Sequence, residues 1–258
     1  MGSRGIATFN DPESRPPSKN SLPTLFVQRF RGLLTKAFST ADPASGKALG
    51  KCIGVYAFYD YDDEPIYVGQ TTEDFATRVG RHLRGQRSDT LAYRILDPFE
   101  VASMRLWPAE QFRTLDRAEK TRAMDALEYS VYAEAVRESK YHAILNEKIP
   151  PLSDEVPLPQ SLKFELVDES MRPEREHPDV RIARRAETLA RVAAVAHERG
   201  EVSPGLRRVI VIQAVRLADL AAARLAYVEG RKGPRPNAID MRELVGNVLA
   251  YADDAYED

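Results

Sequence analysis

Cysteine and histidine are scarce in this chain of 258 residues, which contains one cysteine and four histidines. The single cysteine, Cys52, excludes an internal disulfide framework and a cysteine-rich zinc site. The histidines are dispersed along the chain and lack the close spacing of paired metal ligands. They are His82, His142, His177 and His197.

The chain also lacks a strong excess of charge and a long hydrophobic run. It has 37 lysines and arginines against 39 acidic residues, for a net charge of −2. Any affinity for nucleic acid must therefore come from a local basic patch. No apolar run reaches the length of a transmembrane helix, and the first residues do not follow the pattern of a secretory signal. We therefore expect a cytoplasmic protein without a membrane partner.

Two short aromatic segments, Ile53 to Tyr59 and Pro65 to Gly69, are joined by an acidic turn. This arrangement predicts a β-hairpin. Because side chains alternate between the two faces of a strand, we expect Tyr56 and Tyr67 on one face. The two phenols then form either a packing pair or a polar reaction surface.

Helical patterns follow the hairpin. A helix that begins near Thr72 to Asp74 would place Arg78 and His82 on one face, because they are four residues apart. A later, long helix carries Glu128 beside its apolar stripe, where an unpaired carboxylate is costly. A loop that contains Asn146 closes the segment.

This order of residues resembles the GIY-YIG nuclease superfamily, in which two tyrosine-bearing strands precede an arginine helix, a metal-binding glutamate and an asparagine. Here GVY (54–56) stands for GIY and YVG (67–69) stands for YIG. The resemblance covers roughly Cys52 to Pro150. The functional positions that it implies are Tyr56, Tyr67, Arg78, His82, Glu128 and Asn146. Glu134 is the alternative to Glu128.

The resemblance implies metal-dependent hydrolysis of DNA phosphodiester bonds with one Mg²⁺ or Mn²⁺ ion. Glu128 suits the role of sole protein carboxylate, because Mg²⁺ usually binds few carboxylates together with water and phosphate. Arg78 offers a planar, permanently charged group that pairs with phosphate oxygens. By the same resemblance, Tyr56 helps to activate the attacking water and Tyr67 orients the water or the phosphate. Asn146 would hold the site together by hydrogen bonds.

A basic stripe is expected beside this site. Arginines recur at every third residue without an intervening acid, at Arg78, Arg81, Arg84 and Arg87. We therefore predict that Arg81, Arg84 and Arg87 contact nucleic-acid phosphates without reading the base sequence.

The expected fold is α/β, with a small three-stranded antiparallel sheet flanked by helices and followed by an all-α C-terminal region. The predicted parts are a flexible Pro/Ser-rich arm (1–22), an amphipathic helix and loop (23–50), a GIY-YIG-like nuclease domain (51–150), an acidic Pro-rich linker (151–180) and a helical domain (181–258). Helices are expected at 181–199, 204–229 and 239–255. They are candidates for joining two copies into a homodimer.

Three functions stay open at this point. The first function is that of a metal-dependent endonuclease, which would serve in restriction, phage defence or mobile elements. The second is that of a non-catalytic DNA- or RNA-binding module. The third is that of a partner-binding protein that acts through its C-terminal helices. The arginine and glutamate retained at the motif positions favour the nuclease. The family favours DNA over RNA as the substrate, and metal-dependent cleavage separates the nuclease from both alternatives.

Overall fold

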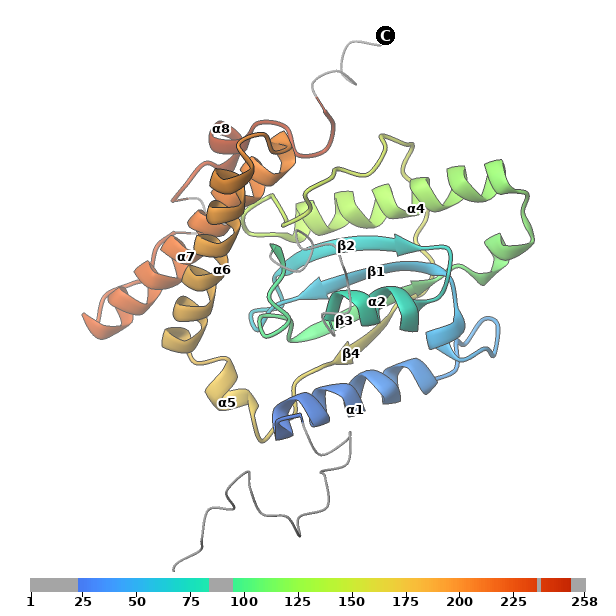
Figure 1. Ribbon diagram of the computed structural model, residues 1–258, viewed down its shortest axis with the longest axis horizontal. Coiled ribbons are helices and arrows are strands. Elements are labelled where there is room, and N and C mark those ends of the chain that lie inside the picture. Colours follow the sequence, from blue (N-terminus) through green and yellow to red (C-terminus); the bar gives the residue numbers. More distant parts are fainter. Residues whose placement is uncertain (1–22, 84–94, 236–237, 252–258) are drawn as a thin grey trace, which may run out of the picture.

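The computed structural model describes residues 23–83, 95–235 and 238–251 (Figure 1). Its centre is a four-stranded antiparallel sheet with the strand order β2-β1-β3-β4. The strands are β1 (Gly54–Tyr59), β2 (Pro65–Thr71), β3 (Ser103–Pro108) and β4 (Leu162–Glu165). The first two strands form the predicted hairpin, and β3 pairs with the other side of β1.

The fourth strand corrects the prediction of a three-stranded sheet. It lies in the segment expected to be a linker, where Leu162 pairs with Leu106 and Phe164 pairs with Met104 of β3. Prolines and acids surround this short strand, so its sequence has little strand character of its own. Its formation depends on pairing with a distant segment and on packing.

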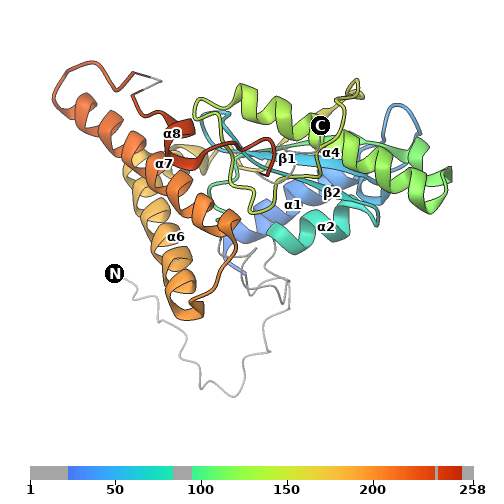
Figure 2. The same ribbon diagram turned by 90° about the horizontal axis from the view of Figure 1, so that it is seen from above.

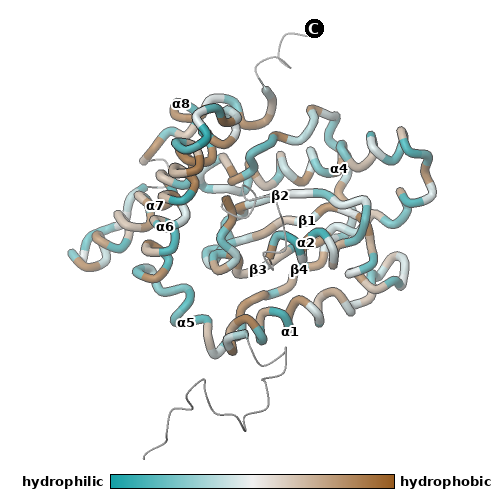
Figure 3. The backbone as a smooth tube through the Cα atoms, in the orientation of Figure 1, coloured by the Kyte–Doolittle hydropathy of each residue, from teal (hydrophilic) through white to brown (hydrophobic). Residues whose placement is uncertain are grey.

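Helices cover both faces of the sheet (Figures 1 and 2). α1 (Leu25–Ser39) and α2 (Phe75–Leu83) lie on one face, and α4 (Arg117–Glu138) lies on the other. α1 buries one side of its amphipathic pattern, and α4 buries the predicted stripe of apolar residues at helical spacing. Short 3₁₀ helices precede β1 and follow β3, namely η1 (Leu49–Lys51) and η2 (Glu110–Thr114). Much of the hydrophobic character follows the strands at the centre of the molecule (Figure 3).

The C-terminal region consists of helices, as predicted. Its elements are α5 (Arg172–Arg175), α6 (Pro178–Arg199), α7 (Pro204–Val228) and α8 (Met241–Val245). Proline occupies the first turn of both long helices, and the Ser203 side chain accepts a hydrogen bond from Leu206 N as the N-cap of α7. The helix expected at 239–255 is wrong in extent, because α8 ends at Gly246, whose φ of 70° favours glycine. None of the described helices is long and apolar enough to cross a membrane.

A buried charge cluster fastens α6 and α7 to the turn between β1 and β2. Asp60 is 2% exposed, and its Oδ2 accepts hydrogen bonds from Arg185 Nη2 (2.9 Å) and Arg216 Nη2 (2.7 Å). Glu100 Oε2 accepts another from Arg185 Nε (2.9 Å), and Arg181 Nη2 lies 3.3 Å from Asp60 Oδ2. Acids buried in this way need partners, since an unpaired buried charge is costly. The acidic turn therefore serves as the anchor of the helical region.

Candidate active site

The hairpin brings the two motif tyrosines together. Tyr56 pairs with Gly69 and Phe58 pairs with Tyr67 in the β1–β2 register, so both tyrosines lie on one face. Their ring centroids are 6.3 Å apart, which confirms the predicted shared face. A Cβ atom at Gly69 would lie 2.7 Å from the Tyr56 hydroxyl oxygen. The glycine of YVG thus leaves the space that the Tyr56 phenol occupies.

α2 places a histidine and an arginine beside these tyrosines. The helix starts where Asp74 Oδ1 accepts a hydrogen bond from Thr77 N (2.6 Å). The His82 ring is buried, with its centroid 5.9 Å from that of Tyr56 and 5.3 Å from that of Tyr67. Arg78 is half-buried, and within the described chain no carboxylate lies at ion-pair distance from it. Its charge is therefore available to an anion that enters from solvent.

Glu128 reaches the site from α4, on the other side of the edge strand β2. Burial raises the pKa of Glu128 to about 7; a hydrogen bond from Gln70 acts against this rise, and the charge of Asp125 adds to it. Asp125 itself accepts a hydrogen bond from Gln70 Nε2 (2.7 Å). The carboxylate of Glu128 is thus held in an environment that favours its neutral form until a cation approaches.

Asn146 acts on the backbone of β2. Its Oδ1 accepts a hydrogen bond from Val68 N (3.0 Å), and its Nδ2 donates one to Val68 O (2.9 Å). The amide therefore imitates a neighbouring strand at the free edge of β2. The side chain thereby fixes the loop at 145–151 against the motif strand.

The same loop is pressed against the start of α7. A Cβ atom at Gly205 would lie 1.8 Å from the carbonyl oxygen of Glu147, so only glycine permits this approach. Ser203 Oγ donates a hydrogen bond to Glu147 Oε1 (2.8 Å). The C-terminal helical region thus supports the loop that carries Asn146.

A cleft of about 570 Å³ collects most of the predicted site. Five predicted residues line it: Tyr67, Arg78, His82, Glu128 and Asn146. Tyr56 is fully buried and lies behind them, against Tyr67 and His82. Glu134, the alternative to Glu128, is not among the residues that line the cleft. A smaller hollow of about 300 Å³ shares Arg78 and Gln70 with the cleft.

The structure describes only part of the predicted basic stripe. Arg81 is a partly exposed residue of α2 that forms an ion pair with Glu73, which reduces the charge it offers to a phosphate. Arg84 and Arg87 lie outside the described residues. Sequence reasoning missed several residues that line the cleft, among them Gln70, Lys148 and Tyr251. Gln70 could have been found, because it directly follows the YVG motif. Nothing in the sequence near Lys148 or Tyr251 indicates that they belong to the site.

The buried position of Tyr56 affects its proton. Burial raises the pKa of the Tyr56 phenol well above its ordinary value, the neighbouring Tyr67 raises it further, and Arg78 acts in the opposite direction. The phenol is therefore neutral in the free protein at physiological pH. Arg78 interacts with the Tyr56 hydroxyl, but among the described residues this hydroxyl makes no hydrogen bond of good geometry.

The carboxylates of the cleft suit one hard cation. Among the described residues, no group of three or more His, Cys, Asp or Glu side chains is arranged to hold a metal. Glu128 and Glu147 are the acids that line the cleft, and Glu147 is bonded to Ser203. Glu128 is therefore the single carboxylate left to bind a metal, which fits Mg²⁺ or Mn²⁺, since these ions take most of their ligands from water and phosphate, and does not fit a structural zinc site.

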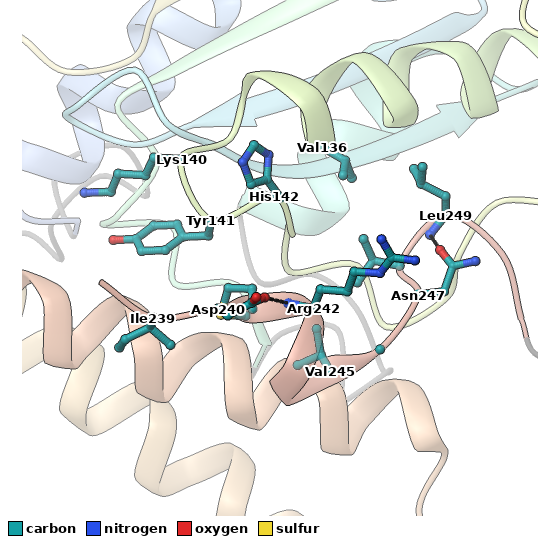
Figure 4. Close-up of a pocket in the computed structure, with 13 residues that line it drawn as sticks. Val136, Lys140, Tyr141, His142, Ile239, Asp240, Arg242, Val245, Asn247 and Leu249 are labelled. Atoms are coloured by element: carbon teal, nitrogen blue, oxygen red, sulfur yellow. Dashed lines mark hydrogen bonds between the residues drawn. The ribbon is translucent and has the colours of Figure 1, made fainter. Parts of the chain in front are cut away.

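A second cavity, of about 540 Å³, lies between the end of α4 and α8 (Figure 4). Its carboxylate, Asp240, accepts hydrogen bonds from the backbone N–H groups of Arg242 and Glu243 and thus caps α8. Lys140, at its rim, pairs with Asp219 of α7. Because these charged groups already have structural partners, this cavity offers weaker support for catalysis than the first cleft.

The raised pKa of Glu128 predicts a pH-dependent stability in the metal-free protein. The folded state holds a proton on Glu128 between its ordinary pKa of 4.5 and about 7, so the free energy of unfolding falls as the pH rises through this window. Glu128→Gln removes this loss and is expected to be more stable than the wild type at pH 8, by roughly 3 kcal/mol, but not at pH 4. Denaturant unfolding in EDTA at both pH values measures the difference. Glu134→Gln, on the same helix, is the control, and an equal difference at both pH values would contradict the prediction.

Comparison with known proteins agrees with this geometry. A family model described as the GIY-YIG catalytic domain matches residues 52–130. No curated protein and no solved structure matches the chain. The family match includes both motif strands, α2 and Glu128, and it ends before Asn146. Residues 52–130 are therefore a GIY-YIG catalytic domain, the domain that characterises the GIY-YIG nuclease superfamily.

Proposed function

We propose that this protein is a metal-dependent endonuclease that hydrolyses phosphodiester bonds in DNA. A nuclease-type function and a nucleic-acid substrate follow from its GIY-YIG domain. The finer proposal is carried by one observation: Arg78, Glu128 and Tyr67 meet in a single solvent-accessible cleft although they come from three different elements.

These residues divide the work of hydrolysis between them. Arg78, with no carboxylate at ion-pair distance among the described residues, pairs with the non-bridging oxygens of the scissile phosphate. Glu128 would hold one divalent ion, Mg²⁺ or Mn²⁺, and such an ion would neutralise charge on the phosphate and on the leaving oxygen. Tyr67 and His82 line the cleft and orient the attacking water. Asn146 keeps β2 and the 145–151 loop in register.

Tyr56 acts from behind this surface. Because its phenol is fully buried and its pKa is raised, it suits the role of a hydrogen-bond relay better than that of a free phenolate base. The positive charge of Arg78 lowers the pKa of Tyr56 and so favours loss of its proton.

Tyr56→Phe is expected to lower the cleavage rate by about 100-fold or more, the usual size of a proton-transfer contribution. The stability of the variant should stay within about 1 kcal/mol of the wild type, because the buried hydroxyl that it removes has only a poorly aligned contact with Arg78. Single-turnover cleavage and thermal unfolding measure the two effects. Tyr59→Phe, on the opposite face of β1, is the matched control. A wild-type rate for Tyr56→Phe would show that this tyrosine serves packing alone.

The proposed activity is tested with purified protein and supercoiled plasmid in Mg²⁺. We expect nicked or linear plasmid with Mg²⁺ and intact plasmid with EDTA, and restoration of cleavage by Mn²⁺. Discrete fragments would further indicate recognition of a sequence. A parallel incubation with labelled RNA decides between the two nucleic acids. Binding of DNA without any cleavage would favour a non-catalytic module on the same fold.

The biological setting and the oligomeric state belong to the same proposal. A role in restriction, phage defence or mobile elements suits a nuclease domain joined to a small helical region. Cutting both strands requires two active sites or two successive cuts, and a homodimer through the C-terminal helices would supply two sites. The end of α7 supports such a contact, because Leu225, Tyr227 and Val228 are between 51% and 77% exposed there. Light scattering of the purified protein measures the mass in solution.

A further inference from the structure

The C-terminal segment brings an aromatic side chain to the catalytic cleft. Tyr251 lines this cleft, although it lies far from the GIY-YIG match in the sequence. After α8, the chain turns at Asn247, whose side chain accepts a hydrogen bond from Leu249 N (Figure 4). The next few residues then reach the 145–151 loop.

Two hydrogen bonds fix the position of this segment. The hydroxyl of Tyr132, on α4, donates a hydrogen bond to Val248 O (2.6 Å). The hydroxyl of Tyr251 accepts one from Ile149 N (3.0 Å). Tyr251 is thus tethered at its hydroxyl end to the loop that also carries Asn146, and its backbone is tethered through Val248 to the helix that carries Glu128.

The ring of Tyr251 stays accessible despite these anchors. Tyr251 is 39% exposed, whereas Tyr132, which makes a similar hydroxyl bond, is 1% exposed and buried in the core. A tyrosine that serves packing alone is expected to resemble Tyr132. Tyr251 instead combines a fixed position with a free aromatic surface in a cleft.

A lysine side chain lines the same cleft as the Tyr251 ring. Lys148 lines the same cleft, is exposed, and has no ion-pair partner among the described residues. An aromatic surface beside an uncompensated cation is the combination that binds single-stranded nucleic acid, because bases stack on the ring and phosphates pair with the charge. Arg78 provides a second cation in the same cleft.

We propose that Tyr251 stacks on a base adjacent to the scissile phosphate, and that Lys148 binds the phosphate of that nucleotide. The proposal rests on the proposed nuclease function and deepens it, because it specifies the substrate class. The preferred substrate has an unpaired nucleotide at the cleavage site, since a base inside an intact duplex stack cannot stack on a side chain.

The test uses DNA of about 20 nucleotides with a central 2-aminopurine, whose fluorescence falls when the base stacks. All proteins carry Glu128→Gln, so that binding is measured without cleavage. With single-stranded DNA we expect quenching by the parent and by Tyr251→Phe, which keeps the ring. Tyr251→Ala should lose the quenching and bind about tenfold more weakly. Leu25→Ala, which removes an exposed apolar side chain at the start of α1, is the control and should behave like the parent.

Three outcomes overturn the proposal in different ways. Equal quenching and affinity for Tyr251→Ala and the parent would exclude stacking on this ring. Equal losses for Tyr251→Phe and Tyr251→Ala would assign the effect to the hydrogen bond with Ile149, and so to loop position. If neither single-stranded nor duplex DNA binds and the plasmid also stays intact, the proposed nuclease function itself fails. If the wild type cleaves the plasmid but Tyr251→Ala does not change DNA binding, only the stacking proposal fails.

Discussion

Glu128→Gln is expected to reduce Mg²⁺-dependent cleavage by about 1,000-fold, which corresponds to ~4 kcal/mol of transition-state stabilisation. Glu128 is the cleft carboxylate that lies beside Arg78 and Gln70, whereas Glu147 is bonded to Ser203 at the start of α7. Glutamine keeps the shape of the side chain but removes the charge that attracts a divalent ion. DNA affinity in the absence of metal should stay within a few-fold of the wild type, because Arg78 and Lys148 are untouched.

Single-turnover cleavage at saturating protein, together with DNA binding in EDTA, measures these two quantities separately. Glu147→Gln is the matched control, since it removes a carboxylate from the same cleft. If Glu147→Gln abolished cleavage and Glu128→Gln did not, the metal would have to be assigned to the loop and not to α4. Cleavage by both variants would turn attention to Glu134, the other candidate on the same helix.

Asp60→Asn is expected to cost about 3–5 kcal/mol of folding free energy, the range for breaking a buried ion pair by removing one partner. Asp60 Oδ2 receives hydrogen bonds from Arg185 and Arg216, and the three side chains are at most 5% exposed. Without the carboxylate, the two guanidinium groups lose their shared partner inside the protein. A loss of this size is a large part of the stability of an ordinary domain.

Urea unfolding followed by circular dichroism measures this loss. Asp63→Asn is the matched control: it removes the same charge from the same turn, where Asp63 is 72% exposed in its side chain and pairs with Lys163 at the surface. We expect a change of less than about 1 kcal/mol for the control. If both variants lost a similar, small amount of folding free energy, Arg185 and Arg216 would have found other partners or water in Asp60→Asn.

The parts of the fold that depend on local pattern were predictable. The alternation in β1 and β2 placed Tyr56 and Tyr67 on one face, and the spacing of Arg78 and His82 placed them on one side of α2. The order of these residues also identified the family. In each case the signal and its consequence lie within a few residues of each other, so no tertiary contact is needed to interpret them.

The parts that depend on distant contacts were not predictable. β4 forms through pairing with β3, and the local sequence around Leu162 to Glu165 does not predict a strand. Arg216 of α7 and Asp60 of the acidic turn are far apart in the sequence, and nothing local to either residue indicates that they form an ion pair. Tyr251 gave no signal for the same reason, because its role depends on the loop that it contacts.

The bond between Asp60 and Arg216 joins residues that are 156 positions apart. During synthesis, the motif strands leave the ribosome well before α7 does, by on the order of ten to thirty seconds at usual elongation rates. Until then the acids of the β1–β2 turn remain in water, and the 145–151 loop has no α7 against which to rest. A nascent chain therefore carries the complete GIY-YIG motif before it has a finished cleft, and the cleft is complete only when the last third of the chain has been translated.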